Sequence, residues 1–282
     1  MKQQSRKFVR GPFYAQNAPL SNGPWWGMTL RAAGSMRFRW NEVNENRFRF
    51  FNDLCGGDRE LAQVELIHSH TVFSVEHASE LEGQQGDGII TTNHALLPVV
   101  TVADCMPIFL YEPAAGVFGV LHSGWRGTGI VRDAIERAEK VYGARRERFS
   151  VVLGPHIRSC CYTVDEERAQ YFRVNFTPDC VTEIRTQHGI FFPGDRKKGE
   201  PVAVEQVPPA RDLRYRLSLA KANLSLLKEL GVNEDNIAVS RDCTCCNSTF
   251  GSFRRETIGL PRDMPLAERQ KHFTVQAAWV MW

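Results

Sequence analysis

The amino-acid sequence predicts a mixed α+β protein, and two observations support this class. Strand-like and helix-like patterns are interspersed along the 282 residues, without the regular strand–helix–strand succession of a doubly wound parallel sheet. Apolar residues make up 43% of the chain and charged residues 24%, which is typical of a compact globular protein. The composition therefore excludes a disordered, collagen-like or low-complexity chain.

The predicted strands are short and bounded by turn-forming residues. They cover residues 64–75, 89–92, 107–111, 116–122, 149–153 and 237–240. The third and fourth of these lie close enough in sequence to form a hairpin that turns near Ala114. In that register Cys105 lies opposite Ser123, one residue from His122.

Two helices are predicted with clear ends, and a third is weaker. In residues 129–142 apolar side chains recur on one face, with Thr128 placed to cap the N-terminus and Gly143 the C-terminus. A second helix covers residues 217–230, and the weaker one covers residues 165–172. No internal repeat interrupts the chain, so we expect a single domain.

Charge is nearly balanced overall but is concentrated near the N-terminus. The chain carries 35 Lys and Arg against 32 Asp and Glu, a net charge of +3. Residues 1–50 hold nine of those basic residues and two acidic ones, a net +7, so the remainder carries −4. This leading segment suits an anionic ligand or forms a solvated arm, and nucleic acid is not required as a partner. Residues 193–209, rich in Pro, Gly and charge, are predicted as an excursion within the domain.

The eight cysteines raise the question of redox compartment. The first ten residues are polar and basic, no apolar signal-peptide segment follows, and no apolar run is long enough to span a bilayer. We therefore expect a cytoplasmic protein with reduced cysteines. The adjacent Cys160 and Cys161 are interpreted as packing residues. Cys243, Cys245 and Cys246 include a C-x-x-C spacing, but no second pair lies at zinc-ribbon distance, so packing is favoured there over a second metal site.

Residues 101–128 (TVADCMPIFLYEPAAGVFGVLHSGWRGT) carry the most informative pattern. On neighbouring rungs of the hairpin, the Cys105 thiolate and the His122 imidazole would be close enough to share a metal ion or a proton. Arg126, Gly127 and Thr128 come immediately before a predicted helix. Free N–H groups at a helix start, a glycine that allows close approach and a planar cation suit phosphate or a carboxylate.

A third metal ligand is expected from His68 or His70, which would share one face of a strand, with His94 a weaker candidate. Two imidazoles and one thiolate leave tetrahedral Zn²⁺ one open position for water or substrate, as in catalytic zinc sites. From the residues alone, the choice between His68 and His70 stays open, and either is explained equally well as a polar strand residue.

Four blocks of the sequence, TVADCMPIFL, GVLHSGWRGT, LGPHIRSCCYTV and RDCTCC with FGSFRRE, resemble the laccase-domain family. This family is also called the multicopper polyphenol oxidase or purine nucleoside phosphorylase family. The resemblance runs from about Trp26 to Phe273. It implies a catalytic domain over residues 26–282, with residues 1–25 as a basic N-terminal extension. It also implies packed β-sheets flanked by helices, similar to the catalytic domains of bacterial deamidating toxins.

The resemblance also implies roles for individual residues. The metal site would be His68, Cys105 and His122, with His68 preferred over His70 because its spacing to Val72 matches the family pattern. Leu66 and Ser69 replace the usual Gln and Gly of that pattern, so His70 stays an alternative. The catalytic residues would be Cys105, His122 and Arg126. The residues expected to contact substrate are Arg31, Asn46, Arg47, Gly127 and Thr128.

The activity that the resemblance implies is zinc-dependent and acts on purine nucleosides. It is phosphorolysis of adenosine, inosine, guanosine or methylthioadenosine, with adenosine deamination in some members. The expected partners are therefore a small nucleoside and phosphate, with neither nucleic acid nor membrane, and the oligomeric state is not predicted. The H-x-E motif of zinc deaminases is absent from the chain, so no proton carrier for deamination is assigned.

Two alternatives are weighed against this activity. In a metal-free cysteine hydrolase or amidase, Cys105 would be the nucleophile and His122 its base. A copper-dependent polyphenol oxidase, as the older family name suggests, would need several His-x-His pairs for its four coppers. The chain has eight histidines and one such pair, His68 with His70, so copper is less favoured than zinc.

Overall fold

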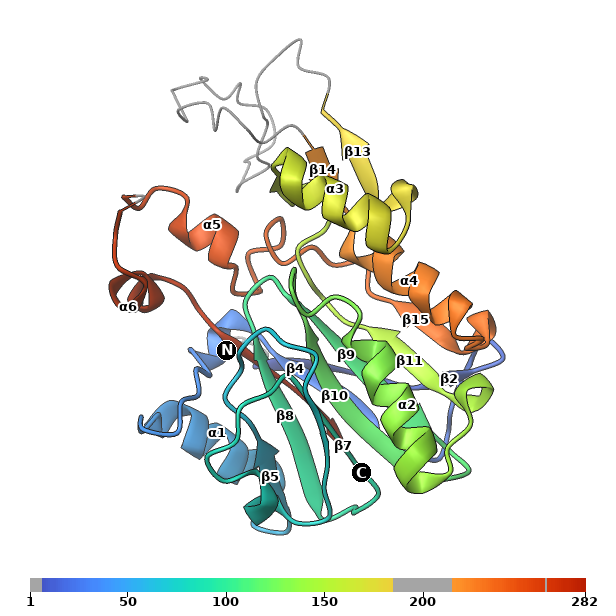
Figure 1. The fold of residues 1–282 in the computed structure, drawn as a ribbon. Helices are drawn as coiled ribbons and strands as arrows, with labels where there is room; N and C mark the ends of the chain where they lie inside the picture. The colour runs from blue at the N-terminus through green and yellow to red at the C-terminus, as the bar shows by residue number, and fades with distance from the viewer. Residues whose placement is uncertain (1–6, 185–214, 262) are drawn as a thin grey trace, which may run out of the picture.

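Two packed β-sheets form the centre of the structure, and helices cover their outer faces (Figure 1). The computed structural model describes residues 7–184, 215–261 and 263–282. The predicted mixed α+β class is confirmed. The excursion predicted at residues 193–209 lies outside the described residues.

The regular elements alternate irregularly along the chain. The strands are β1 Phe8–Pro12, β2 Tyr14–Ala15, β3 Ala18–Pro19, β4 Trp25–Thr29, β5 Glu60–Gln63, β6 Val72–Ser74, β7 Gly88–Thr91, β8 Leu96–Val102, β9 Met106–Glu112, β10 Val117–Ser123, β11 Ser150–Leu153, β12 Thr163–Val164, β13 Val181–Glu183, β14 Tyr215–Leu217, β15 Ile237–Val239 and β16 Gln276–Met281. The α-helices are α1 Glu45–Cys55, α2 Ile130–Tyr142, α3 Glu166–Asn175, α4 Leu219–Glu229, α5 Phe253–Thr257 and α6 Leu266–Arg269. Short 3₁₀ turns cover Arg31–Ala33, Ala78–Leu81, Arg146–Arg148, Pro178–Cys180, Glu234–Asn236 and Gln270–His272.

The first sheet has the strand order β1-β4-β16-β8-β5 and the second β15-β11-β9-β10-β7-β6. Most neighbours are antiparallel, but β5 with β8, β6 with β7 and β11 with β15 are parallel. The strand β1 pairs with β4 from Phe8 to Pro12, so the basic leading segment contributes an edge strand to the first sheet. A three-stranded sheet, β12-β14-β13, and the pair β2-β3 complete the topology.

Alternation along the central strands explains the layers. In β9, Phe109 and Tyr111 pack between the two sheets, while Ile108 and Leu110 pack against the helices α2 and α4. In β16, Trp279 faces the opposite way, towards α1. Because both faces of these strands are covered, their sequences are continuously apolar rather than alternating.

The predicted hairpin forms between β9 and β10, but its register is one residue away from the prediction. Pro107 pairs with His122 and Met106 with Ser123, so the prediction that Cys105 lies opposite Ser123 was wrong. The turn takes up residues 113–116 and ends at Gly116, whose φ of +69° suits glycine. Cys105 therefore lies level with Gly124, where an added Cβ would be 2.8 Å from the Cys105 Sγ.

The strand predicted over residues 64–75 is wrong over most of its length. Only β6 falls within it, and His68 and His70 lie in the loop that precedes β6, so they do not share a strand face. The physical reason is Asp87, whose carboxylate accepts the backbone N–H groups of His68 and Ser69 and holds the loop out of the sheet.

The predicted helices are confirmed as α2, α4 and α3, with one correction at an end. Thr128 does not cap α2, because its hydroxyl donates to the Gly124 carbonyl at 2.6 Å and Gly129 takes the cap position with φ +112°. The C-cap at Gly143 is confirmed, with left-handed backbone geometry. Within the described residues, no helix is long and apolar enough to cross a membrane.

Candidate functional site

His68, Cys105 and His122 come together at one end of the central sheets. His68 lies in the loop before β6, Cys105 immediately before β9, and His122 near the end of β10. One nitrogen or sulfur atom of each side chain lies within 4.8 Å of the corresponding atoms of the other two. His122 is buried, Cys105 is half-buried and His68 is exposed, so the cluster opens to solvent on the His68 side.

A buried carboxylate, Asp87, holds both histidines. Its Oδ1 lies 2.9 Å from the His122 Nδ1 and accepts the His68 backbone N–H at 2.9 Å. Its Oδ2 accepts the N–H and the hydroxyl of Ser69. Because Nδ1 of His122 is bonded to Asp87, the free nitrogen of that ring is Nε2, on the side of the cluster.

A second buried carboxylate, Asp104, fixes the backbone beside Cys105. Asp104 has a φ of +79°, a conformation that non-glycine residues rarely adopt. Its carboxylate accepts the Thr244 hydroxyl at 2.6 Å, the Ser252 hydroxyl at 3.0 Å and the Arg254 N–H at 2.6 Å. His68 is likewise left-handed, with a φ of +60°. Such conformations persist only where the surroundings impose them, and here both flank the cluster.

Electrostatics favour a thiolate at Cys105 and a protonated ring at His122 when the cluster holds no metal. Burial opposes ionisation of the Cys105 thiol, but the charge of His122 and hydrogen bonds from His122 and His68 outweigh it and lower the pKa to about 6. Burial also disfavours the charged form of His122, but Cys105 and Asp87 outweigh it and raise the pKa to about 10. The pKa of Asp87 is lowered despite its burial, by its hydrogen bond with His122, the charge of that ring and its bonds with Ser69.

The geometry separates the two histidines that the sequence left as alternatives. The His70 Nδ1 lies 3.2 Å from the Asp133 carboxylate and its Nε2 lies 3.1 Å from the Thr128 carbonyl oxygen. Both ring nitrogens of His70 are therefore engaged with α2 and the loop before it. The structure brings His68, and not His70, to Cys105 and His122.

The loop between β10 and α2 places Trp125 and Arg126 beside the cluster. Arg126 is exposed and stacks over the Trp125 ring at 5.2 Å, and no salt bridge within the described residues neutralises it. Trp125, Arg126, Glu167 and Tyr171 line a pocket of about 490 Å³. This volume lies in the range of small-molecule sites, and its lining offers aromatic rings, a cation and a carboxylate.

Gly127 and Thr128 are packed too tightly to project side chains into that pocket. A Cβ at Gly127 would meet the carbonyl oxygens of His122 and Ser69 at 3.2 Å. Thr128 is buried and bonded through its hydroxyl to Gly124 and through its carbonyl to His70. Only backbone N–H groups of these two residues can serve a ligand.

The side chains of the other three residues expected to contact substrate are bonded to other parts of the protein. The Arg47 guanidinium is buried, donates to the Met36 carbonyl and to Gln63, and its pKa falls to about 9 because of burial. Asn46 donates to the Ala33 carbonyl at 2.8 Å. Arg31 is half-exposed, with Glu256 at 3.6 Å. The structure does not bring these side chains into the cluster.

Several residues of the site were not singled out from the sequence. Asp87 and Asp104 could have been identified from the sequence, since each is an acidic residue next to an apolar segment. Arg168 stacks over Trp125 at 3.9 Å and donates to the Tyr162 hydroxyl at 3.4 Å, so α3 forms the wall of the site opposite Arg126. Nothing in the local sequence of α3 indicates this position, which depends on tertiary packing.

The thiolate at Cys105 leads to a prediction for the metal-free protein. After removal of metal with a chelator, alkylation of Cys105 by iodoacetamide is expected to reach half its maximal rate near pH 6. Above that pH the thiolate predominates, and below it the thiol is protonated and unreactive. In His122→Ala the charge and the hydrogen bond of His122 that favour the thiolate are lost, while the burial of Cys105 remains. The pH midpoint of alkylation is therefore expected to move above the ordinary cysteine pKa of about 8.5. Peptide mass spectrometry identifies the alkylated residue, and an unchanged midpoint in the variant would contradict the pairing.

Known proteins resemble the chain over most of its length. The family model described as "Multi-copper polyphenol oxidoreductase laccase" matches residues 15–262. A protein of Deinococcus radiodurans named "Purine nucleoside phosphorylase" is 30% identical over 261 residues, covering 89% of this chain and 88% of the relative. "Adenosine deaminase RL5", from an unidentified prokaryote, is 28% identical over 190 residues, which are 66% of this chain and 63% of the relative.

The fold matches a solved structure as well. The crystal structure of YlmD from Geobacillus stearothermophilus superposes with a TM-score of 0.71 at 23% identity, covering 99% of this chain and 97% of that one. At this identity the likeness establishes the arrangement of the sheets and helices.

Proposed function

The chain belongs to the multi-copper polyphenol oxidoreductase laccase family, and from this premise we propose that it is a zinc-dependent purine nucleoside phosphorylase. The observation that carries the proposal is the meeting of His68, Cys105 and His122 next to a pocket lined by the exposed Arg126. A relative of similar length is named for this activity.

The three side chains fit a zinc ion. Two imidazole nitrogens and one thiolate are donors that Zn²⁺ prefers, and three protein ligands leave a position open. The carboxylate of Asp87 behind His122 is the outer partner that metal-binding histidines usually have. When bound, the zinc ion acts as a Lewis acid that polarises or orients the substrate. Binding requires His122 to give up its Nε2 proton, so affinity for the metal falls as pH falls.

The arginine of the pocket has a role in holding phosphate. The Arg126 guanidinium offers a planar cation, and the N–H groups of Gly127 and Thr128 are further donors at the start of α2. Phosphate held there would attack C1′ of the ribose while the bond from C1′ to the purine nitrogen breaks. The proton of hydrogen phosphate ends on the departing base, so no hydrolytic water is consumed.

The remaining lining of the pocket suits the nucleoside. Tyr171 and Trp125 provide ring surfaces for a flat heterocycle, and the Glu167 carboxylate can accept from a ribose hydroxyl. Arg31, Asn46 and Arg47 are not assigned a contact with substrate, because their side chains are engaged elsewhere. The proposed substrates are therefore purine nucleosides as a class: adenosine, inosine, guanosine and methylthioadenosine.

Adenosine deamination is a second candidate, favoured by the relative named for it. This reaction needs a group that carries a proton between water and the base. Asp87 is the carboxylate in contact with the cluster, and its four polar contacts with His68, Ser69 and His122 commit it to positioning. Phosphorolysis needs no such carrier and is therefore preferred.

A metal-free cysteine hydrolase is the alternative from a different class. The low pKa of Cys105 beside a protonated His122 would suit a nucleophile, as would the expected likeness to deamidating toxins. Copper-dependent polyphenol oxidation is less favoured, since the cluster offers two imidazoles and not the many that a multicopper centre needs.

The test is an assay of base release with and without phosphate. Zinc-loaded protein is expected to release hypoxanthine from inosine and adenine from adenosine only when phosphate is present, with ribose 1-phosphate as the second product. Ammonia release from adenosine without phosphate would favour deamination instead. Zinc-loaded protein that produces neither a free base nor ammonia would refute a purine nucleoside activity.

A further inference from the structure

Four cysteine sulfurs meet in a second cluster, away from the histidines. The Sγ atoms of Cys160, Cys161, Cys243 and Cys246 all lie within 4.8 Å of one another. The Cys246 sulfur is 3.3 Å from that of Cys161 and 3.5 Å from that of Cys160. The C-x-x-C segment of Cys243 and Cys246 therefore faces the adjacent Cys160 and Cys161. The predicted packing is confirmed for Cys161 and Cys243, which lie in the core, whereas Cys160 and Cys246 are exposed.

We propose that Cys160, Cys161, Cys243 and Cys246 bind a single zinc ion as four thiolates. At a Zn–S distance of about 2.3 Å, the sulfurs of a tetrahedral site are about 3.8 Å apart. The two separations from the Cys246 sulfur, 3.3 and 3.5 Å, and the limit of 4.8 Å for the other pairs bracket this spacing. A disulfide would need about 2.05 Å, and an iron–sulfur cluster would hold its cysteines farther apart around a larger core.

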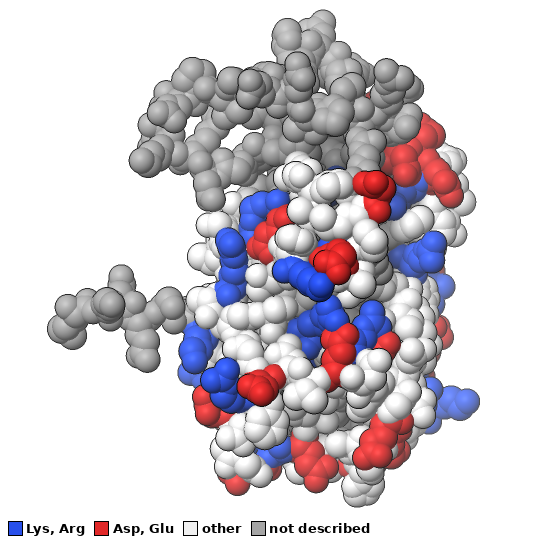
Figure 2. All heavy atoms as spheres, turned by 90° about the vertical axis from the view of Figure 1, so that its left-hand side faces the viewer, with Lys and Arg blue, Asp and Glu red and all other residues white. Residues whose placement is uncertain are grey.

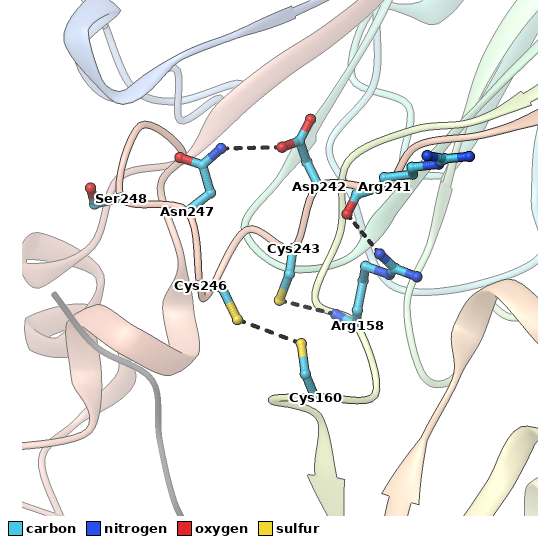
Figure 3. A pocket seen from close by; sticks show the side chains of 8 residues that line it. All are labelled: Arg158, Cys160, Arg241, Asp242, Cys243, Cys246, Asn247 and Ser248. Atoms are coloured by element: carbon cyan, nitrogen blue, oxygen red, sulfur yellow. Dashed lines mark hydrogen bonds between the residues drawn. The ribbon is translucent and has the colours of Figure 1, made fainter. Parts of the chain in front are cut away.

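A backbone donor and two cationic side chains lie beside the four sulfurs. The Arg158 backbone N–H points at the Cys243 sulfur at 3.4 Å, a contact that stabilises a metal-bound thiolate. The side chains of Arg158 and Arg241 stand at the same pocket, with Asp242 beside them (Figure 3). A tetrathiolate zinc carries a net charge of −2, which these two arginines partly balance.

The backbone on both sides is arranged as two turns that face each other. Cys243 begins a turn closed by the Asn247 N–H on its carbonyl at 2.9 Å, and Cys160 and Cys161 follow a turn closed on Arg158. Figure 3 shows the Cys160 and Cys246 side chains pointing towards one another from these two segments. The turns are more than 80 residues apart in sequence and are joined by the bridge between His156 and Cys243 and by hydrogen bonds from Arg158 to Cys243 and Arg241. A shared ion would fasten them together.

A zinc ion at the four cysteines would also stabilise the first cluster, because Asp104 connects the two sites. Thr244, within the C-x-x-C turn, donates to Asp104, and so do Ser252 and Arg254 farther along the same segment. Asp104 in turn sets the backbone of Cys105. The role of the second zinc ion is thus structural, since four protein ligands leave no position open for a substrate.

The test separates the two metal sites by variants. In His68→Gly, which removes a ligand of the first cluster, anaerobically purified protein is expected to retain one zinc ion per chain. Adding Cys160→Ser and Cys246→Ser to this variant, both at exposed positions, is expected to remove the remaining zinc ion. Cys245→Ala is the matched control, because it removes a thiol from the same turn that is outside the group of four, and it should keep the zinc. Zinc that survives the loss of Cys160 and Cys246, or that is lost in Cys245→Ala, would overturn the assignment.

A spectroscopic measurement on the otherwise unaltered chain keeps the proposal testable if the variants fold poorly. Cobalt substituted for zinc should give the ligand-field and thiolate charge-transfer bands of a tetrahedral tetrathiolate, in addition to those of a site with two imidazoles. Absence of the tetrathiolate bands, or a Cys160–Cys246 disulfide in protein kept under reducing conditions, would also overturn it. Neither measurement depends on enzymatic activity, so the phosphorylase proposal can fail while this one stands.

Discussion

Replacing His68 by glycine is expected to lower phosphate-dependent base release by a factor of about 10³, equivalent to about 4 kcal/mol of transition-state stabilisation. The variant removes one of three ligands, so the remaining thiolate and imidazole hold zinc weakly and the reaction loses its metal. Glycine is chosen because His68 has a φ of +60°, which glycine adopts without steric cost, so the loop is expected to keep its shape. Rates of hypoxanthine release and metal content at the first cluster are measured on the same preparation.

The matched control is His70→Gly, two residues away in the same loop. His70 is engaged with Asp133 and Thr128, so its loss removes surface contacts and leaves the cluster intact. Its activity is expected to stay within about fivefold of the parent protein, since exposed ion pairs contribute at most about 1 kcal/mol. If His70→Gly lost activity as severely as His68→Gly, the assignment of the third ligand would be wrong. Full phosphate-dependent base release in His68→Gly would contradict the requirement for a metal ion at this cluster.

Replacing Asp87 by asparagine is expected to weaken metal binding by about 10- to 100-fold and to destabilise the fold by about 2–4 kcal/mol. The Asp87 carboxylate accepts hydrogen bonds from His68, Ser69 and His122. An asparagine amide would place its own N–H groups opposite some of those donors, where an acceptor is needed. Both effects are measured on purified protein, the first by competition with a chelator and the second by urea unfolding of the metal-free form.

The control for Asp87→Asn is Asp133→Asn, which alters a half-exposed carboxylate next to His70. It is expected to change stability by no more than about 0.5 kcal/mol.

The contribution of Asp87 to stability depends on pH in a definite direction. Because the folded pKa of Asp87 lies below its ordinary value, its contribution to stability is present above about pH 3.9 and is lost as the pH falls below that value. A variant that is as stable as the parent at pH 7 would contradict the role given to Asp87.

The sequence predicted the fold class and the hairpin because their signals are local. Apolar strands on either side of a turn near Ala114 indicated β9 and β10, and that pairing alone brought Cys105 close to His122. The register was missed by one residue because the turn takes up four residues and ends at Gly116, and turn length is not fixed by the apolar pattern. Despite this error in register, Cys105 lies close to His122 as predicted, since it precedes the paired segment and approaches His122 across Gly124.

Other features depend on contacts between segments far apart in sequence. The position of His68 follows from a buried carboxylate 19 residues later, and a strand prediction for that segment had no means of including it. The cysteine pairs at 160–161 and 243–246 meet only after β11, α3, α4 and β15 have packed. Arg31, Asn46 and Arg47 were selected by resemblance, and their contacts with Glu256, Ala33 and Gln63 become visible only in the structure.

The surface agrees with a small-molecule enzyme in one respect. Lys and Arg side chains are interspersed with Asp and Glu side chains on the face drawn in Figure 2, rather than gathered into one field. Two arginines of the first 50 residues are in ion pairs, Arg37 with Glu42 and Arg39 with Glu65. The basic excess of the first 50 residues is therefore partly neutralised within the fold.

We infer that a metal ion held by His68, Cys105 and His122 is needed for phosphorolysis, and removal and return of the metal is the decisive experiment. Hypoxanthine release from inosine is measured in the presence of phosphate before the metal is stripped, after stripping under reducing conditions, and after zinc is returned. The rate is expected to be lost on stripping and recovered with zinc, and His68→Gly is expected not to recover it. An undiminished rate in the stripped protein would show that phosphorolysis does not need the metal.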